Sequence, residues 1–215
     1  MSTDPVRVEG FREPQQARSR QALQRILTAA EEVLHANGFD DFTMAAVAEQ
    51  ADVSIGNIYR RFDGREQLLA AVKDRLLSGM EKRVAEALAA ADAGLAGVVD
   101  AYTYALVDAL AAGGKTLADL LRVQDPALAD RGSRAHAEMR RLVRDAAAPY
   151  MAEIRRADPS AALDVAIRTV TAACLFTAVQ GGDVGWSAYV DQMSDMALAY
   201  LLTPDRRKRA DESAR

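Results

Sequence analysis

The side chains from Ser54 to Arg61 (SIGNIYRR) carry hydrogen-bonding groups, and their spacing predicts a short helix. Ile58 and Phe62 lie four residues apart, so one face of that helix is apolar and packs against the protein. The remaining residues then face outward: Ser54, Ile55, Asn57, Tyr59, Arg60 and Arg61. Hydroxyl, amide and guanidinium donors on one short helix suit a DNA major groove, where base edges and phosphates accept hydrogen bonds. We therefore expect this helix to bind DNA.

The residues before this helix predict a second helix and a tight turn. Thr43 is the expected N-cap, because its hydroxyl can accept a hydrogen bond from a backbone N–H two or three residues on. Apolar residues then repeat at helical spacing: Met44, Val47, Ala48 and Ala51. Asp52 stands at the turn, Val53 supplies an apolar contact, and Ser54 is the expected cap of the second helix. Residues 43–62 therefore read as a helix-turn-helix.

This stretch resembles the helix-turn-helix of the TetR family of transcriptional regulators. The matching positions are Thr43, Val47, Ala48, Ala51, Val53, Ser54, Gly56, Ile58, Tyr59 and Phe62. The flanking sequences ILTAAEEVLHANGF (26–39) and GREQLL (64–69) are similar to the family's first helix and to the start of its fourth. Asp52 stands where the family usually has Gly, and Ile55 stands where a polar or basic residue is common. Asp enters the left-handed conformation more readily than most residues, so we expect the turn to be kept.

Two groups of arginines flank the motif and predict contacts with DNA phosphates. The first group is Arg12, Arg18, Arg20 and Arg25, and the second is Arg60, Arg61 and Arg65. The formal net charge of −4 argues against sequence-blind binding by charge alone, so phosphate contacts must be local. We expect Tyr59, Arg60 and Arg65 to contact phosphates and Asn57 or Ser54 to reach a base edge. The full set of expected DNA-binding residues is Thr43, Ser54, Ile55, Gly56, Asn57, Tyr59, Arg60, Arg61, Arg65 and Arg20.

The composition predicts an all-α protein of the cytoplasm. Half of the 215 residues are apolar and only 6% are aromatic, while Gly and Pro are sparse. A single cysteine, Cys174, fits a reducing compartment. The first ten residues lack the apolar core of a signal peptide. The longest uncharged run, Thr169 to Gly182, has 14 residues and is shorter than the roughly 20 needed to span a bilayer, so we expect no membrane contact.

Apolar periodicity, interrupted by Gly and Pro, predicts the helices and two domains. The expected helices cover about 17–37, 64–91, 95–112, 116–124, 132–156, 160–180 and 184–202, in addition to the helix-turn-helix. We expect a DNA-binding domain over 18–80 and a helical effector-binding and dimerisation domain over 81–204, joined by the long helix 64–91. The charged tail 205–215, which contains RRKR, is expected to be disordered.

Polar and aromatic residues among the apolar positions of the second domain predict a small-molecule site. Such sites are mostly apolar with a few placed polar groups. The candidates are Tyr102, Tyr104, Arg122, His136, Met139, Phe176, Gln180 and Trp186. The alternative for each residue is an ordinary place in the core or on the surface. The expected effector is small and apolar or amphipathic, and its identity stays open.

The helices 160–180 and 184–202 are apolar around most of their circumference, so they need burial on more than one side. Burial in a larger monomeric core is one solution. The TetR resemblance implies the other, because in that family the corresponding helices of two subunits form a four-helix dimer interface. We therefore expect a homodimer.

Together these features predict a homodimeric transcriptional repressor that a small effector releases from double-stranded operator DNA. Such release requires different effector affinities for the DNA-binding conformation and its alternative. An effector-free DNA-binding protein is one alternative, and a helical enzyme that carries a similar N-terminal module is another. His35, His136 and Cys174 are isolated in the sequence, so we expect no catalytic residue, metal site or cofactor.

Overall fold

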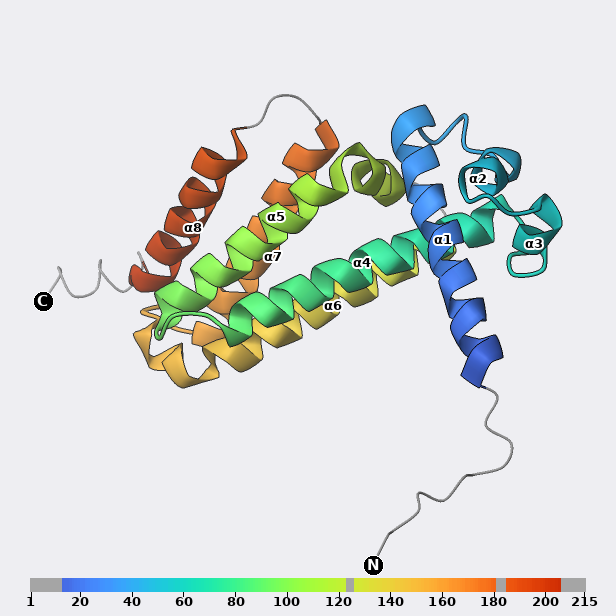
Figure 1. Cartoon of the computed structure of the whole chain (residues 1–215). Coiled ribbons are helices and arrows are strands. Elements are labelled where there is room, and N and C mark those ends of the chain that lie inside the picture. Colours follow the sequence, from blue (N-terminus) through green and yellow to red (C-terminus); the bar gives the residue numbers. More distant parts are fainter. Residues whose placement is uncertain (1–12, 123–125, 181–184, 206–215) are drawn as a thin grey trace, which may run out of the picture. The chain divides into compact units, whose positions relative to one another are not determined.

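The computed structural model describes residues 13–122, 126–180 and 185–205, and over these residues the chain is all-helical (Figure 1). The elements are α1 (Glu13–Asn37), α2 (Met44–Gln50), α3 (Ile55–Tyr59), α4 (Arg65–Ala89), α5 (Leu95–Arg122), α6 (Pro126–Ala147), the 3-10 helix η1 (Ala148–Glu153), α7 (Pro159–Gln180) and α8 (Trp186–Leu202). The chain divides into two compact units after Leu69, inside α4. The prediction of an all-α fold, with a helix-turn-helix domain and a helical second domain, is confirmed.

The N-terminal unit buries one face of each of its helices in a small shared core. Ile26, Leu34, Phe42, Val47 and Ile58 are at most 2% exposed. Helix α1 ends where Gly38 takes a φ of 77°, a left-handed conformation that glycine adopts without strain. Because α2 and α3 are short, neither could form a stable helix alone, and this apolar core stabilises both.

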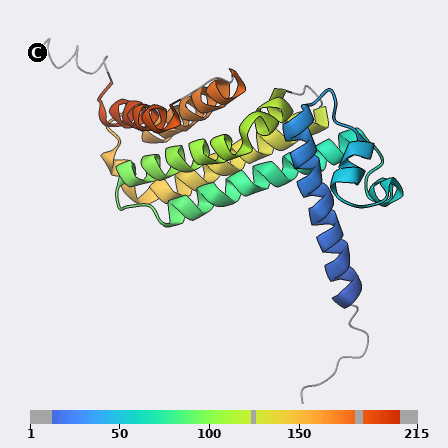
Figure 2. The same cartoon turned by 45° about the horizontal axis from the view of Figure 1, so that its top comes forward.

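The C-terminal unit is built around α5, which packs against α6, α7 and α8. Figure 2 shows α4 and α6 side by side on one flank of α5 and α8 on the other. The core includes Val84 of α4, Leu106 of α5, Val143 of α6, Leu163 of α7 and Leu201 of α8, each no more than 1% exposed. An Arg131 guanidinium also joins α6 to α4, donating 2.5 Å to Asp74 and 2.8 Å to Glu81.

Helix α5 corrects one prediction, because the expected helices 95–112 and 116–124 form a single helix through Gly113 and Gly114. Two glycines in a helix interior cost about 2 kcal/mol relative to alanine. Burial of Leu110, Leu117 and Leu120 outweighs this cost, since each buried leucine contributes about 1.5–3 kcal/mol. A Cβ at position 113 would lie 2.9 Å from the Cβ of Leu117, so glycine also suits this packing.

The first and last residues of α6 also differ from the prediction. The expected helix 132–156 begins earlier, at Pro126, and ends at Ala147. Proline is well tolerated in the first turn of a helix, which explains the early start. The six residues from Ala148 to Glu153 form a 3-10 helix, because Pro149 has no N–H to continue the α-helical pattern. The second expected break was at Asp125–Pro126, and Asp125 lies outside the described residues. The expected break at Gly181–Gly182, Arg12 and the tail from residue 206 lie outside them as well.

Two helical segments, Leu95–Gly113 and Pro159–Gln180, are long and apolar enough to cross a membrane by length and composition. The expectation drawn from the longest uncharged run was therefore too simple. About 50% of the first segment and 39% of the second is buried inside the protein, and core helices of soluble proteins pass the same test. The second segment has the smaller buried share.

Candidate nucleic-acid interface

The start of α2 is fixed by the predicted Thr43 cap. The Oγ1 of Thr43 accepts a hydrogen bond from the Ala46 N–H at 3.1 Å, and the Thr43 backbone is extended, with φ −129° and ψ 151°. Met44, Val47 and Ala48 then bury the inner face of α2. Gln50 also donates to Glu32 at 2.7 Å, which ties α2 to α1. This cap and these contacts hold α2 in place beneath the turn that follows.

The turn between α2 and α3 depends on Asp52, which has a φ of 52°. Among the described residues, Asp52 alone combines a side chain with a left-handed backbone, a conformation that Asp tolerates better than most residues. The N–H of Val53 donates to the carbonyl of Ala48 at 3.0 Å and closes the turn. Ser54 occupies the N-cap position of α3 as predicted, but its hydroxyl makes no capping hydrogen bond. Ser54 is exposed, so its hydroxyl is accessible to a partner.

Helix α3 buries one face and exposes the other, as its spacing predicts. Ile58 is 0% exposed, whereas Ile55 is 45% and Tyr59 is 51% exposed. Ser54 and Gly56 are exposed beside them. Two large apolar side chains on the surface of a five-residue helix are unusual for a face that meets only water. The outer face of α3 is therefore a candidate contact surface.

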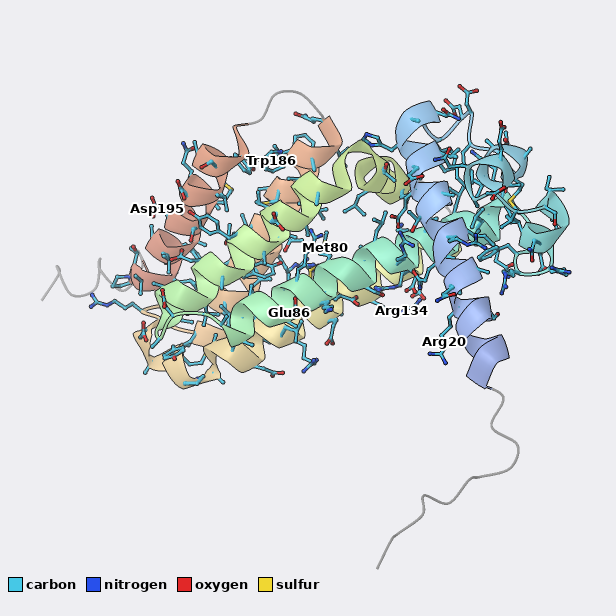
Figure 3. The ribbon with its side chains drawn as sticks, viewed as in Figure 1. Arg20, Met80, Glu86, Arg134, Trp186 and Asp195 are labelled. Atoms are coloured by element: carbon cyan, nitrogen blue, oxygen red, sulfur yellow. The ribbon has the colours of Figure 1, made fainter. Side chains whose placement is uncertain are left out.

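The arginines near α3 differ in the hydrogen bonds that their side chains make. Arg60 donates 2.6 Å to the Oδ1 of Asn57, so the two side chains lie together beside α3. Arg61 donates 3.2 Å to the hydroxyl of Ser19 on α1. Arg20 is exposed on the same helix (Figure 3). The side chain of Arg18 lies outside the described part of the structure.

Arg65 faces inward, which the sequence does not indicate. Its guanidinium donates to the carbonyls of Phe42, at 3.0 Å, and of Phe39. Its Cζ also lies 4.4 Å from the centre of the Phe39 ring. These contacts fasten the loop between α1 and α2 to the first turn of α4, so the guanidinium is already occupied inside the protein.

The family model described as "Bacterial regulatory proteins, tetR family" matches residues 26–72, which include α2, the turn and α3. Residues 26–72 therefore form a helix-turn-helix domain of the TetR family. No curated protein matches its sequence.

Solved structures share the fold of the chain over most of their length. A putative TetR-family regulator from Mesorhizobium loti is 17% identical with a TM-score of 0.68, over 86% of this chain and 96% of that one. A TetR-family regulator from Streptomyces coelicolor is 26% identical with a TM-score of 0.56, over 85% and 97%. FadR from Bacillus subtilis, solved in complex with stearoyl-CoA, is 19% identical with a TM-score of 0.63, over 83% and 98%. The family match identifies this chain as a DNA-binding regulator.

The predicted effector residues are spread over the C-terminal unit. Tyr102 and Met139 are buried in the core. The Tyr102 hydroxyl lies 2.6 Å from the Oγ1 of Thr171, and burial raises the pKa of Tyr102 to about 12. His136 is half-buried on α6, and burial together with the charges of Arg140 and Arg168 lowers its pKa.

The other effector candidates lie at the surface or are only partly covered. Tyr104, Phe176 and Gln180 are exposed, and the Tyr104 hydroxyl donates to a carboxylate oxygen of Asp191 on α8. Trp186 is half-buried and packs edge-on against Tyr189, with 5.9 Å between the ring centres. The side chain of Arg122 is outside the described residues. The candidates whose side chains are described therefore do not converge on one site.

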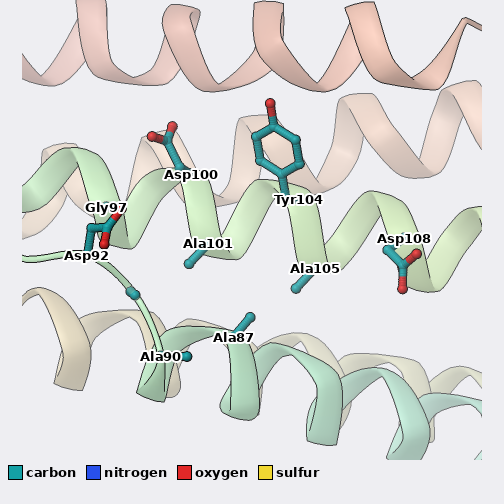
Figure 4. Close-up of a pocket in the computed structure, with 10 residues that line it drawn as sticks. Ala87, Ala90, Asp92, Gly97, Asp100, Ala101, Tyr104, Ala105 and Asp108 are labelled. Carbon is teal, nitrogen blue, oxygen red and sulfur yellow. The ribbon is translucent and has the colours of Figure 1, made fainter.

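An open groove of about 490 Å³ lies between α4 and α5 (Figure 4). Ala87 of α4, Ala90 just after its end, and Ala101 and Ala105 of α5 form its floor. Tyr104 and three carboxylates border it: Asp92, Asp100 and Asp108. Of these residues, only Tyr104 is a candidate on sequence grounds. The four-residue spacing of positions 100, 104 and 108 places them on one side of a helix and could have indicated the rest.

Proposed function

We propose that this TetR-family protein is a cytoplasmic, homodimeric repressor that binds operator DNA through α3 and is released by a small-molecule effector. The observation that carries the DNA-binding part is the exposed outer face of α3 on a family helix-turn-helix. Tyr59 supplies a hydroxyl for a phosphate, Arg60 a charge for another, and Ser54 and Asn57 polar groups for base edges. Ile55 supplies an apolar contact, which suits a thymine methyl group.

Gly56 gives independent support for close approach of DNA to α3. Its backbone is helical, and a Cβ built at this position would have no heavy atom within 4 Å. Packing inside the protein therefore does not require glycine here. Glycine weakens a helix by about 1 kcal/mol relative to alanine, so its presence on an exposed helix face fits a partner that comes very near the backbone.

Arg65 takes a different role in this proposal from the one first expected. Because its guanidinium is bound to two carbonyls and stacked on Phe39, we assign it to holding the N-terminal unit together. Arg61, which contacts α1 through Ser19, keeps its expected role near the phosphates, together with Thr43 at the start of α2 and Arg20 on α1.

The proposed dimer rests on the uncovered side of α7 and α8. An exposed stripe runs along the whole of α7: Ala161, Val165, Arg168, Thr169, Ala172, Phe176 and Gln180. Val165 is 49% and Phe176 64% exposed, and Met196 and Leu202 of α8 are exposed as well. Small residues between large apolar ones let two helices approach closely, so a second copy of this surface is a suitable partner.

The proposed effector must open the core of the C-terminal unit. Tyr102 and Met139 are packed among apolar side chains, and the Tyr102 hydroxyl is satisfied by Thr171. A ligand that inserts between α5, α6 and α7 would displace these contacts and favour a second conformation. The stearoyl-CoA complex of the Bacillus subtilis neighbour makes long-chain acyl compounds one class to test, beside lipophilic metabolites and cationic drugs.

Selection of genomic DNA fragments by the purified protein, followed by sequencing, tests the DNA-binding part. We expect enrichment of a palindrome whose half-sites lie about one helical turn apart, as a symmetric dimer requires. Failure to enrich any sequence would contradict the proposal.

A thermal-shift screen followed by operator release tests the effector part. An effector should raise the melting temperature and weaken operator binding, and operator DNA should weaken effector binding by the same factor. A compound that stabilises the protein but leaves operator binding unchanged would contradict the release mechanism and favour the effector-free alternative.

A further inference from the structure

We propose that the groove between α4 and α5 is a docking site for the basic segment Arg206–Arg209 (RRKR) of the same chain. This contact is separate from DNA and effector binding, and it does not depend on the function proposed above. Three observations support it: the negative charge of the groove, the place where the described chain ends, and the arrangement of α5 and α8.

The groove carries an excess of negative charge. Asp92, Asp100 and Asp108 border it, and the neighbouring helix α8 adds Asp191 and Asp195 beside Tyr104. Arg83 lies 3.4 Å from Asp108 at one end, in an exposed pair that neutralises little. Asp100 accepts its hydrogen bond from the neutral hydroxyl of Ser194 and keeps its charge uncompensated by that bond. A cationic partner therefore suits the end of the groove near Asp92 and Asp100.

The shape of the groove suits an extended peptide. Its floor consists of alanines, and Figure 4 shows Ala101 and Ala105 pointing toward α4 while Asp100 and Tyr104 point toward α8. The loop that carries Asp92 passes close over the start of α5, since a Cβ at Gly97 would lie 2.1 Å from the Asp92 carbonyl oxygen. Glycine at 97 is thus required for Asp92 to stand at the mouth of the groove. No group of three or more metal-binding side chains occurs among the described residues, which disfavours a metal ion as the occupant.

The described chain ends close to this mouth. Helices α5 and α8 run antiparallel, because Asp191 meets Tyr104 and Ser194 meets Asp100. The end of α8 is therefore carried toward the start of α5. Asp205, the last described residue, is held by the Ala157 N–H at 2.8 Å and by Arg156 at 3.1 Å.

A short path connects this anchor to the groove. Glu153, four residues before Ala157, accepts a hydrogen bond from the Leu95 N–H at 3.2 Å, at the first residue of α5. Four residues of chain span at most about 14 Å. The four basic residues directly follow Asp205, and their backbone can also span about 14 Å. Each Arg or Lys side chain extends further from that backbone. They can therefore reach Asp92 and Asp100, whereas Asp108 lies about 12 Å further along α5 than Asp100.

Limited trypsin digestion of the full-length protein tests the docking directly, because trypsin cleaves after Arg and Lys. We expect slow cleavage at residues 206–209 in low salt and cleavage about tenfold faster in the triple variant Asp92→Asn, Asp100→Asn, Asp108→Asn, since several weak ion pairs are lost together. High salt should speed cleavage of the wild type and leave the triple variant unchanged. The matched control removes three exposed or half-exposed carboxylates of α6: Asp130→Asn, Glu138→Gln and Asp145→Asn.

A second measurement guards against misfolding of the triple variant. Cys174 is buried, so a fluorophore can be attached selectively at Ser213→Cys in the tail. We expect its anisotropy to be high in low salt for the wild type and low for a variant with Gln at positions 206–209, which leaves the groove intact. Equal cleavage rates in the wild type and the triple variant, or an anisotropy that salt and the Gln substitutions do not change, would overturn the proposal. Equal spermidine affinity for the wild type and the Gln variant would also overturn it, because the groove would then hold a small cation and no tail.

Discussion

The outer faces of α3 and α7 both expose large apolar side chains, yet their surroundings differ. Ile55 and Tyr59 of α3 stand beside Asn57 and Arg60, whose side chains are joined by a hydrogen bond of 2.6 Å. Val165 and Phe176 of α7 stand in a stripe of Ala and Thr with one arginine. Hydrogen-bond donors beside apolar groups suit DNA, whereas an extended apolar stripe with small residues suits another protein surface. The kind of partner that an exposed apolar face binds is therefore indicated by the polar groups around that face.

The largest effect is expected from charges placed in the α7 stripe. Val165→Glu with Phe176→Glu should abolish the dimer, because each charge would be buried against its symmetry mate at a cost of several kcal/mol. Both side chains are exposed in the single chain, so thermal stability of the monomer should change little. Sedimentation measures the dimer, and Ala137→Glu on the exposed side of α6 is the control. A dimer that persists in the double variant would place the interface elsewhere.

The next largest effect is expected at Arg65, which we assign a structural role, unlike the arginines of the α3 face. Arg65→Gln should lower the stability of the N-terminal unit by about 2–3 kcal/mol, since two charge-assisted hydrogen bonds to carbonyls are lost. Arg65→Lys should also destabilise it, because an ammonium cannot reproduce the planar fork. Urea unfolding measures both. Wild-type stability together with a lower salt dependence of DNA binding would show that Arg65 contacts phosphate after all.

A smaller effect is expected from the α3 face itself. Tyr59→Ala and Arg60→Ala should each weaken operator binding about tenfold, and Arg60→Ala should reduce the salt slope by about 1. Ile55→Ala should instead change the preferred base without changing the salt slope, because it removes no charge. Fluorescence anisotropy with a selected operator at several salt concentrations separates these results. Unchanged affinity and slope in both variants would mean that α3 does not face DNA.

The smallest effect concerns the core behind α7. Tyr102→Phe removes the hydrogen bond to Thr171 and should cost about 1 kcal/mol, because Thr171 still donates to the Ile167 carbonyl at 2.7 Å. The pKa of Tyr102 is raised from 10.0 to about 12. The unfolded chain therefore releases this proton at lower pH than the folded protein, and stability falls as pH rises from 10 to 12 by about 1.4 kcal/mol per unit. The Phe variant should lack this loss in alkaline unfolding experiments, and an identical alkaline profile would contradict the burial of the phenol.

Local sequence was sufficient for the helix-turn-helix. Thr43 caps α2 as predicted, Asp52 adopts the left-handed turn, and Ile58 is buried while Tyr59 is exposed. Each of these features depends on interactions within a few residues, so spacing and residue type predict them. The prediction that the Ser54 side chain caps α3 was wrong, because Ser54 holds the N-cap position without a capping hydrogen bond.

The arrangement of the second domain was much less predictable. The Gly113–Gly114 break was wrong because long-range burial of Leu117 and Leu120 outweighs the local cost of glycine. The proposed effector residues contain both core and surface positions, since the same aromatic and polar residue types occur in both. The continuity of α5 through Gly113 and Gly114 does not follow from residues that are close in the sequence. The helical period separates Tyr102 from Tyr104, but it does not indicate which of the two is buried.

The sequence alone thus determined the helical class, the two-helix motif and the outward face of α3, because period, caps and turn residues act locally. Only the tertiary structure decided that Arg65 binds carbonyls inside the N-terminal unit, that Tyr102 is buried against Thr171, and that Asp92 and Asp100 border one groove. Those facts depend on which helices pack together. Packing is set by the sum of many weak contacts between distant residues, and no single stretch of sequence contains that sum.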